Sequence, residues 1–364
     1  MSTAAPAQST TDLQQKTQSS FVTLNLITQA CHGILNTVFI APSPKPDWFD
    51  DLNAKLDAAK VNAGDWINNL APSITGGVPL QVINYGTTYA AFSAQIMDIA
   101  NKHPDAQGAD DPYVKQVHQL VSALESSVAE IITNAQTTSD QLTAWGILMQ
   151  KSHDDLTTGA ANIQGAETDL STDITKMNNA ISTLNDMIHK ENIAIAASAG
   201  GIGLGLLMLV AGIALAPETG GASAYLVAGT GAALIIGGSI TWGVMQAKIN
   251  EQFKDIATDQ KELDDDKRQL VALQGLSSAS DQSIQYTTDA GNALSDFRTS
   301  WNVFQGELKG VMDKLEKAES SLSVLVSSTW TAAAQKEWDD ATTFAQSLAD
   351  APVQVVEKQL PMVA

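Results

Sequence analysis

The chain has 364 residues, of which 40 are acidic and 20 are basic, so its formal net charge at pH 7 is −20. This charge opposes nucleic-acid binding, because phosphate contacts need clustered Lys and Arg. It also disfavours capture by anionic lipid through charge alone, so any attachment to a membrane should come from apolar insertion.

Residues 1–11 are rich in Ser, Thr, Ala, Pro and Gln, and we expect them to form a disordered N-terminus. The first residues lack the basic start and apolar core of a secretory signal peptide, so no cleavable Sec signal is expected. The single cysteine, Cys31, permits no disulfide within the chain. Its apolar neighbours Ile27 and Ile34 predict a buried thiol on a helix.

Apolar residues at helical spacing predict helices in the first part of the chain, over residues 12–40, 47–70 and 78–102. Pro72 and the pair Gly76-Gly77 should separate the second helix from the third, because proline lacks a backbone donor and obstructs the preceding turn. Residues 103–112 form a polar loop with two prolines.

Two longer segments carry coiled-coil seams, in which apolar residues alternate in steps of three and four. The first seam lies in the proline-free run 113–192 and comprises Leu156, Ala160, Ile163, Leu170, Ile174, Met177, Ile181, Leu184 and Ile188. The second begins at Phe253, Ile256, Leu263, Leu270 and Leu273 and continues through Leu294, Phe297, Trp301, Phe304, Leu308, Val311, Leu315, Ala318 and Leu322. A last helix is expected over residues 329–349.

Two long antiparallel helices would bury these seams against each other. The sequence therefore predicts an all-α fold, an elongated bundle of long antiparallel helices. Residues 12–192 and 248–350 would form this bundle, the tail, and residues 351–364 a non-helical C-terminal segment.

Between the seams lies a head of residues 193–247, which contains two apolar runs, Ile193–Ala216 and Ala222–Met245. Each run exceeds the roughly 20 residues that a helix needs to cross a bilayer. The residues expected to insert are Ile193, Ile202, Leu204, Leu206, Leu207, Met208, Leu209, Val210, Ile213, Leu215, Tyr225, Leu226, Val227, Leu234, Ile235, Ile236, Ile240, Trp242 and Val244. The turn between the runs holds Pro217, Glu218, Gly220 and Gly221.

Glu218 is the only formal charge in this hairpin, and complete crossing would place it in water on the far side. The aromatic rings of Tyr225 and Trp242 suit the two bilayer interfaces. The head also contains closely spaced glycines, at Gly200, Gly201, Gly203, Gly205, Gly237 and Gly238. They could allow close helix packing in a membrane, mark a segment that adopts another structure before insertion, or belong to a thin core helix.

No pattern predicts a catalytic, metal or cofactor site. The five histidines are scattered singly, and the acidic runs at 154–155 and 264–266 are typical of solvated helix faces. The glycines at 200–205 follow no expected strand and precede no Lys-Ser or Lys-Thr, which excludes a phosphate loop. We therefore predict that the protein is not an enzyme.

This organisation, with seams on both sides of one apolar hairpin, resembles the cytolysin A (haemolysin E) family of α-pore-forming toxins, which includes Bacillus haemolysin BL and Nhe. The length of the runs is most similar to a pore-inserting component of the Gram-negative tripartite toxins. The resemblance implies a soluble protein that extends its head into a membrane and assembles into a ring. The hairpin carries few polar side chains, among them Ser198, Thr230, Ser239 and Thr241.

We therefore expect a component of a multi-component α-helical pore-forming toxin, secreted without a cleavable signal. Its partners would be the target-cell lipid bilayer, further copies of itself and other toxin components. Two other hypotheses remain open: a secretion-system translocator or two-span membrane protein, and a structural coiled-coil or adaptor protein whose hairpin is buried core.

Overall fold

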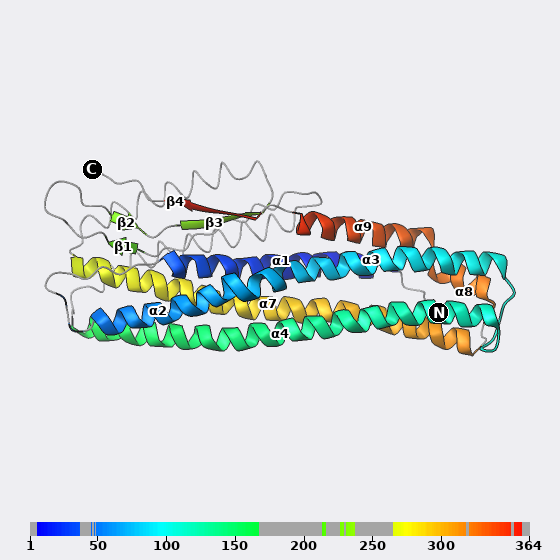
Figure 1. Cartoon of the computed structure of the whole chain (residues 1–364), viewed down its shortest axis with the longest axis horizontal. Coiled ribbons are helices and arrows are strands. Elements are labelled where there is room, and N and C mark those ends of the chain that lie inside the picture. Colours follow the sequence, from blue (N-terminus) through cyan, green and yellow to red (C-terminus); the bar gives the residue numbers. More distant parts are fainter. Residues whose placement is uncertain are drawn as a thin grey trace. The chain divides into compact units, whose positions relative to one another are not determined.

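The computed structural model describes residues 6–36, 45, 47, 49–166, 213–215, 226–228, 231–236, 265–317, 320–350 and 353–358. Figure 1 shows that helices dominate this part of the chain. They are α1 (Pro6–Asn36), α2 (Phe49–Asp65), the π-helical turn η1 (Trp66–Leu70), α3 (Ala71–Lys102), α4 (Pro112–Ala166), α7 (Asp265–Glu316), α8 (Leu322–Thr329) and α9 (Ala332–Ala349). The prediction of an all-α helical bundle is confirmed.

The chain divides into two compact units, each made of several segments. Unit 1 comprises Met1–Val22, Ile74–Gln141 and Ala290–Asp350. Unit 2 comprises Thr23–Ser73, Leu142–Asp289 and Ala351–Ala364. Segments far apart in sequence therefore build each core.

In unit 1, helices α4 and α7 run antiparallel. The His118 ring lies 3.1 Å from the Glu316 carboxylate, and the Gln305 side chain donates to Glu125 at 2.7 Å. Residue numbers thus rise along one helix as they fall along the other. The antiparallel course of these helices agrees with the sequence prediction, whereas the first-seam residues from Leu170 to Ile188 lie outside the described residues.

The core of unit 1 is an aromatic cluster from α3, α7 and α9. The ring of Tyr85 lies 5.0 Å from that of Trp301 and 4.7 Å from that of Trp338. Phe304 and Tyr89 also contact Trp338, at 5.0 and 5.4 Å. Burial raises the pKa of Tyr89 to about 12. Such tilted and edge-to-face pairs add to the large apolar area that each ring buries.

Helix α1 begins at Pro6, so the expectation that residues 1–11 are disordered is wrong from Pro6 onward. Thr10 is buried and donates a hydrogen bond to the Glu337 carboxylate at 3.3 Å. Two residues later, Asp12 accepts a hydrogen bond from Ser300 at 2.8 Å. These polar contacts hold a helix end whose composition alone favours disorder.

In unit 2, Trp66, the first residue of η1, packs against Trp145 of α4, and their ring centroids lie 4.9 Å apart. Asn62 of α2 also contacts α4, because its side-chain amide donates to the Leu148 carbonyl at 3.2 Å and to Ser152 Oγ at 2.9 Å. The Trp145 indole in turn donates to the Asn62 carbonyl at 2.9 Å. Three hydrogen bonds and one ring contact therefore join the two segments at this junction.

Cys31 is fully buried in α1, as the sequence predicts. Burial raises the pKa of its thiol well above the usual value. The thiol is therefore neutral at physiological pH and a poor nucleophile.

Pro72 and Gly76-Gly77 do not separate two helices, contrary to the sequence prediction. Instead η1 joins α2 directly to α3, which begins at Ala71 and also contains Pro79. The Ala71 amide donates to the Trp66 carbonyl, five residues back, so the widened turn precedes the proline directly. Proline is tolerated in the first turn of a helix, where its missing donor costs little.

The second seam also ends earlier than predicted. Helix α7 stops at Glu316, and Leu322 starts a separate helix, α8, after the extended residue Ser321. The amides of Leu322 and Ser323 donate to the carbonyls of Ala106 and Pro104 in the polar loop, at 2.9 and 3.3 Å. These bonds satisfy two of the free donors of the α8 N-terminus and stabilise the break.

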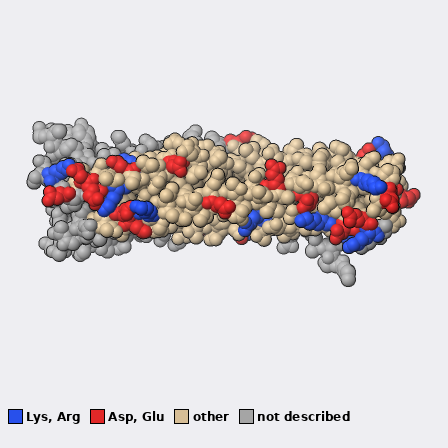
Figure 2. Space-filling model, turned by 60° about the horizontal axis from the view of Figure 1, so that its bottom comes forward, with Lys and Arg blue, Asp and Glu red and all other residues tan. Residues whose placement is uncertain are grey.

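The surface carries acidic and basic side chains interspersed, with broad uncharged stretches between them on the face shown in Figure 2. Several of the lysines pair one turn away on their own helix: Lys55 with Asp51, Lys102 with Asp98 and Lys151 with Asp155, each at 2.7 Å. Such exposed pairs contribute about 0.3–0.5 kcal/mol each.

Candidate functional site

The apolar segment between α4 and α7 contains three described strands, β1 (Ile213–Leu215), β2 (Leu226–Ala228) and β3 (Gly231–Ile236). Strands β1 and β2 pair antiparallel, with Ile213 opposite Ala228 and Leu215 opposite Leu226. The predicted turn at 217–221 lies between these two strands in the sequence and outside the described residues.

A second, separate two-stranded sheet joins this segment to the C-terminal part of the chain. Strand β3 pairs antiparallel with β4 (Val353–Lys358), and the register runs from Ile236 opposite Val353 to Gly231 opposite Lys358. Figure 1 shows β4, in dark red, lying along β3. Both strands belong to unit 2.

Seven of the residues predicted to insert lie on the described strands: Ile213 and Leu215 on β1, Leu226 and Val227 on β2, and Leu234, Ile235 and Ile236 on β3. The other predicted positions lie outside the described residues: Ile193, Ile202, Leu204, Leu206, Leu207, Met208, Leu209, Val210, Tyr225, Ile240, Trp242 and Val244. The same holds for the turn residues Pro217, Glu218, Gly220 and Gly221 and for the six glycines of the head at 200, 201, 203, 205, 237 and 238.

Strand structure at these positions bears on how the segment behaves in water and in lipid. Leu, Ile, Val and Ala are compatible with either helix or strand, and the tertiary context decides between them. Within a bilayer every backbone donor and acceptor needs a partner, which a helix provides internally and an open two-stranded sheet does not. The paired strands described here therefore leave backbone groups that lipid could not satisfy.

Strand β4 was not predicted, although the sequence carries a signal for it. Residues 353–356, Val-Gln-Val-Val, are rich in a β-branched residue and follow directly on Pro352. Short runs of this kind bounded by proline favour a strand. Its partner could not be found by pattern alone, because β3 precedes it by more than a hundred residues.

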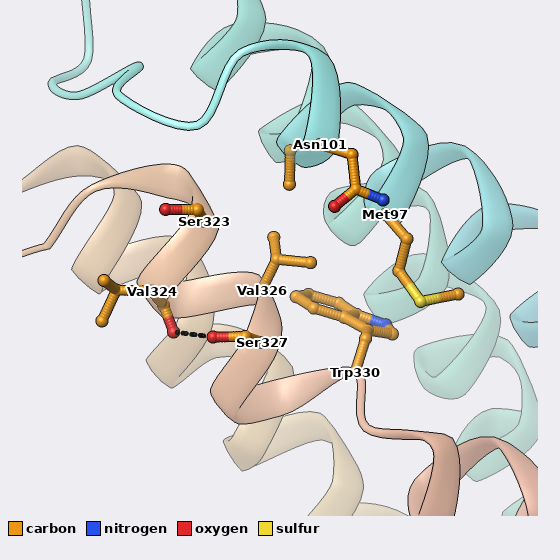
Figure 3. A pocket seen from close by; sticks show the side chains of 8 residues that line it. Met97, Asn101, Ser323, Val324, Val326, Ser327 and Trp330 are labelled. Atoms are coloured by element: carbon orange, nitrogen blue, oxygen red, sulfur yellow. Dashed lines mark hydrogen bonds between the residues drawn. The ribbon is translucent and has the colours of Figure 1, made fainter.

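The helices offer one pocket of note among the described residues, of about 410 Å³ in unit 1. Figure 3 shows it between α3 and α8. Its lining consists of Met97, Ala100, Asn101, Ser323, Val324, Val326, Ser327 and Trp330. This lining contains no ionisable side chain that could act as a general base for the hydroxyls of Ser323 and Ser327. The Trp330 indole nitrogen is itself fully buried, which keeps any ligand in the pocket from reaching it.

Within the described residues, no three side chains of His, Cys, Asp and Glu come close enough together to hold a metal ion. Among the helices of the described part, none combines the length and apolar character that a membrane span requires.

Comparisons with known proteins agree with this architecture. Residues 42–191 match the model of a family described as Bacillus haemolytic enterotoxin (HBL). No curated protein sequence matches the chain. The resemblance predicted from the sequence is confirmed by this family match and by the solved structures that follow.

Motility Associated Killing Factor B from Vibrio cholerae has a similar fold, with a TM-score of 0.73 and 12% identity over 94% of this chain and 93% of that chain. The soluble form of AhlB, from a tripartite α-pore-forming toxin of Aeromonas hydrophila, gives a TM-score of 0.65 and 15% identity over 94% and 92%. The pore form of AhlB gives 0.56 and 15% over 94% and 97%. The chain is thus more similar to the soluble form than to the pore form.

Proposed function

We propose that this chain, which has the fold of α-pore-forming toxin components, is itself a component of a multi-component toxin of this kind. Its soluble form would extend the apolar hairpin into a target membrane and assemble with other chains into a lytic pore. The observation that carries the proposal is the conformation of the hairpin. Two runs long enough to cross a bilayer as helices hold strands at residues 213–215, 226–228 and 231–236.

The comparison with AhlB also supports a change from the conformation described here to an inserted one. One protein gives two forms, and this chain is more similar to the soluble one, with a TM-score of 0.65 against 0.56. A change from paired strands to crossing helices would satisfy the backbone within lipid. We therefore assign residues 193–247 to the inserting head, and residues 12–192 and 248–350 to a helical tail that acts outside the producing cell.

The proposed partners are the lipid bilayer of the target cell, further copies of this chain and other toxin components. A wide pore needs a polar lining, and the few hydroxyl side chains of the hairpin, such as Ser198, Thr230, Ser239 and Thr241, supply little of it. A second component with an amphipathic hairpin would provide the rest. The proposed activity involves no catalytic step, cofactor or metal.

Deletion of residues 202–236 tests the proposal. The deletant should keep the far-ultraviolet circular dichroism of the helical bundle but lose flotation with vesicles of phosphatidylcholine and cholesterol. It should also fail to lyse cells when mixed with the products of neighbouring genes. Lysis by the deletant under those conditions would overturn the proposal.

A pair of single substitutions gives a sharper comparison. Leu209→Asp places a charge in the first apolar run, at a cost of roughly 2.5–3.5 kcal/mol if that position enters the bilayer. Val61→Asp makes a similar change on α2, where the Val61 side chain is 71% exposed. We expect L209D to lose flotation and V61D to retain it. A structural adaptor protein with a buried hairpin would stay in the aqueous fraction in its native sequence as well.

A further inference from the structure

Strand β4 covers the part of the second apolar run that forms β3. All six residues of β3 are paired, and the six residues opposite them are Val353, Gln354, Val355, Val356, Glu357 and Lys358. Gln354 stands opposite Ile235, and Glu357 stands opposite Ala232. A segment near the C-terminus, which carries Gln354, Glu357 and Lys358 among its valines, therefore pairs with one edge of a strand in the most apolar part of the sequence.

This pairing is incompatible with insertion of the second run. A helix through residues 231–236 would use their amides and carbonyls within its own turns, so none would remain for β4. Carrying β4 into the bilayer as a strand would bring Glu357 and Lys358 with it, and charged residues are costly at that depth. Strand β4 must separate from β3 before the run can cross.

The connection of β4 to the helical bundle is short. Helix α9 ends at Ala349, and β4 begins at Val353. Strand β4 thus follows α9 closely in the sequence, and α9 lies outside the head. Strand β3, in contrast, belongs to the segment that must move. Separation of the two strands is the step that frees the head from the C-terminal segment.

We propose that β4 is an intramolecular strap, which holds the second apolar run in its β conformation until the protein meets a membrane. The inference rests on the proposed function, because it concerns the same hairpin. It adds residues 353–358 as a regulatory element that lies outside the hairpin.

A reversible cross-link between the strands tests the strap directly. In antiparallel pairs the Cα separation alternates between about 5.5 and 4.5 Å, both within the usual range for a disulfide. Two adjacent pairs, L234C with V355C and A233C with V356C, therefore sample both kinds of site. Cys31 can stay in place, because burial keeps its thiol neutral and enclosed.

With either pair oxidised by glutathione disulfide, flotation with vesicles of phosphatidylcholine and cholesterol should be lost. Reduction with dithiothreitol should restore it, and the single-cysteine variants should float in both states. If a mass-verified cross-linked protein floats as well as its reduced form, the strap is overturned. If neither the reduced protein nor the native chain floats, it is the proposed function that fails.

The strap can also be judged without a membrane. Val355→Pro removes a backbone donor from β4, whereas Val355→Thr keeps a β-branched residue and the donor. V355P should bind more of the dye 8-anilinonaphthalene-1-sulfonate and be cut faster by protease within residues 222–245, while V355T behaves as the native chain. Unchanged dye binding and cleavage in V355P would overturn the inference whatever the result with vesicles.

Discussion

Gly86 lies where helix α3 packs closely against α9 in unit 1. A Cβ atom at this position would collide with Thr342 Oγ1 and would lie 3.2 Å from Thr342 Cβ. Thr342 Oγ1 is fixed by its hydrogen bond to the Trp338 carbonyl at 2.7 Å. The Gly86→Ala substitution must therefore push α9 away or displace a held side chain.

The magnitude follows from two opposing effects. Alanine is favoured over glycine in a helix interior by about 0.5–1 kcal/mol. Forcing an extra methyl group into a packed contact costs typically about 1–3 kcal/mol. We expect a net loss of roughly 1 kcal/mol for G86A. With a urea slope of roughly 3 kcal/mol/M, the unfolding midpoint should fall by about 0.3 M.

Two variants control this result in the same assay, urea unfolding followed by circular dichroism. A Cβ at Gly291 on α7 meets no atom within 4 Å, so Gly291→Ala should raise the midpoint. Thr342→Ala removes the colliding oxygen, so the double variant G86A/T342A should recover most of the loss and show strong coupling. A midpoint for G86A at or above that of the native chain would refute the close approach of the two helices.

Three further predictions concern hydrogen bonds, a helix cap and pH. Asn62→Ala should lower the free energy of unfolding by about 1–2 kcal/mol, because two hydrogen bonds between helices are lost. The control is Asn68→Ala, because the Asn68 amide donates only to the Gly64 carbonyl one turn back. This substitution should change the free energy of unfolding by less than about 0.5 kcal/mol. Thr331→Ala should lower the free energy of unfolding by about 1 kcal/mol, because the Thr331 side chain caps α9. Ser321 makes no capping bond to α8, so Ser321→Ala should cost less in the same urea titration. Burial holds the pKa of Tyr89 at about 12, above its ordinary value of 10.0. The stability that depends on neutral Tyr89 is therefore complete below pH 10 and falls as the pH rises from 10 toward 12. Midpoints at pH 8 and pH 11 should therefore differ less in Tyr89→Phe than in the native chain.

The helices could be predicted because their buried residues recur in steps of three and four. Phe297, Trp301, Phe304, Leu308 and Leu315 of the second seam are all buried, as the spacing requires. Spacing also placed Cys31 in the core. These positions depend only on local periodicity, which one sequence contains in full.

The errors arose where distant contacts or backbone geometry decide. The order of residues 6–11 depends on α1 contacts such as that of Thr10 with Glu337, more than three hundred residues away. The break after Glu316 is held by carbonyls of the loop at 104–106. Strand β4 is held by its backbone pairing with β3. None of these partners can be identified from a pattern in one sequence.

The π-helical turn η1 also determines where the continuous run of α2 and α3 can lose a residue. Buried residues along α2 advance by three or four positions as far as Trp66, the next is Ala71, five positions on, and steps of three or four then resume through Ile74 and Val78. One residue added or removed elsewhere would rotate all that follows by about 100° and turn Tyr85 and Tyr89 out of the core. Removing one residue from 67–70 would instead shorten the step from Trp66 to Ala71 to four positions. The buried residues before and after η1 would then keep their present faces. Single-residue deletions should be tolerated there and rejected in the flanking helices.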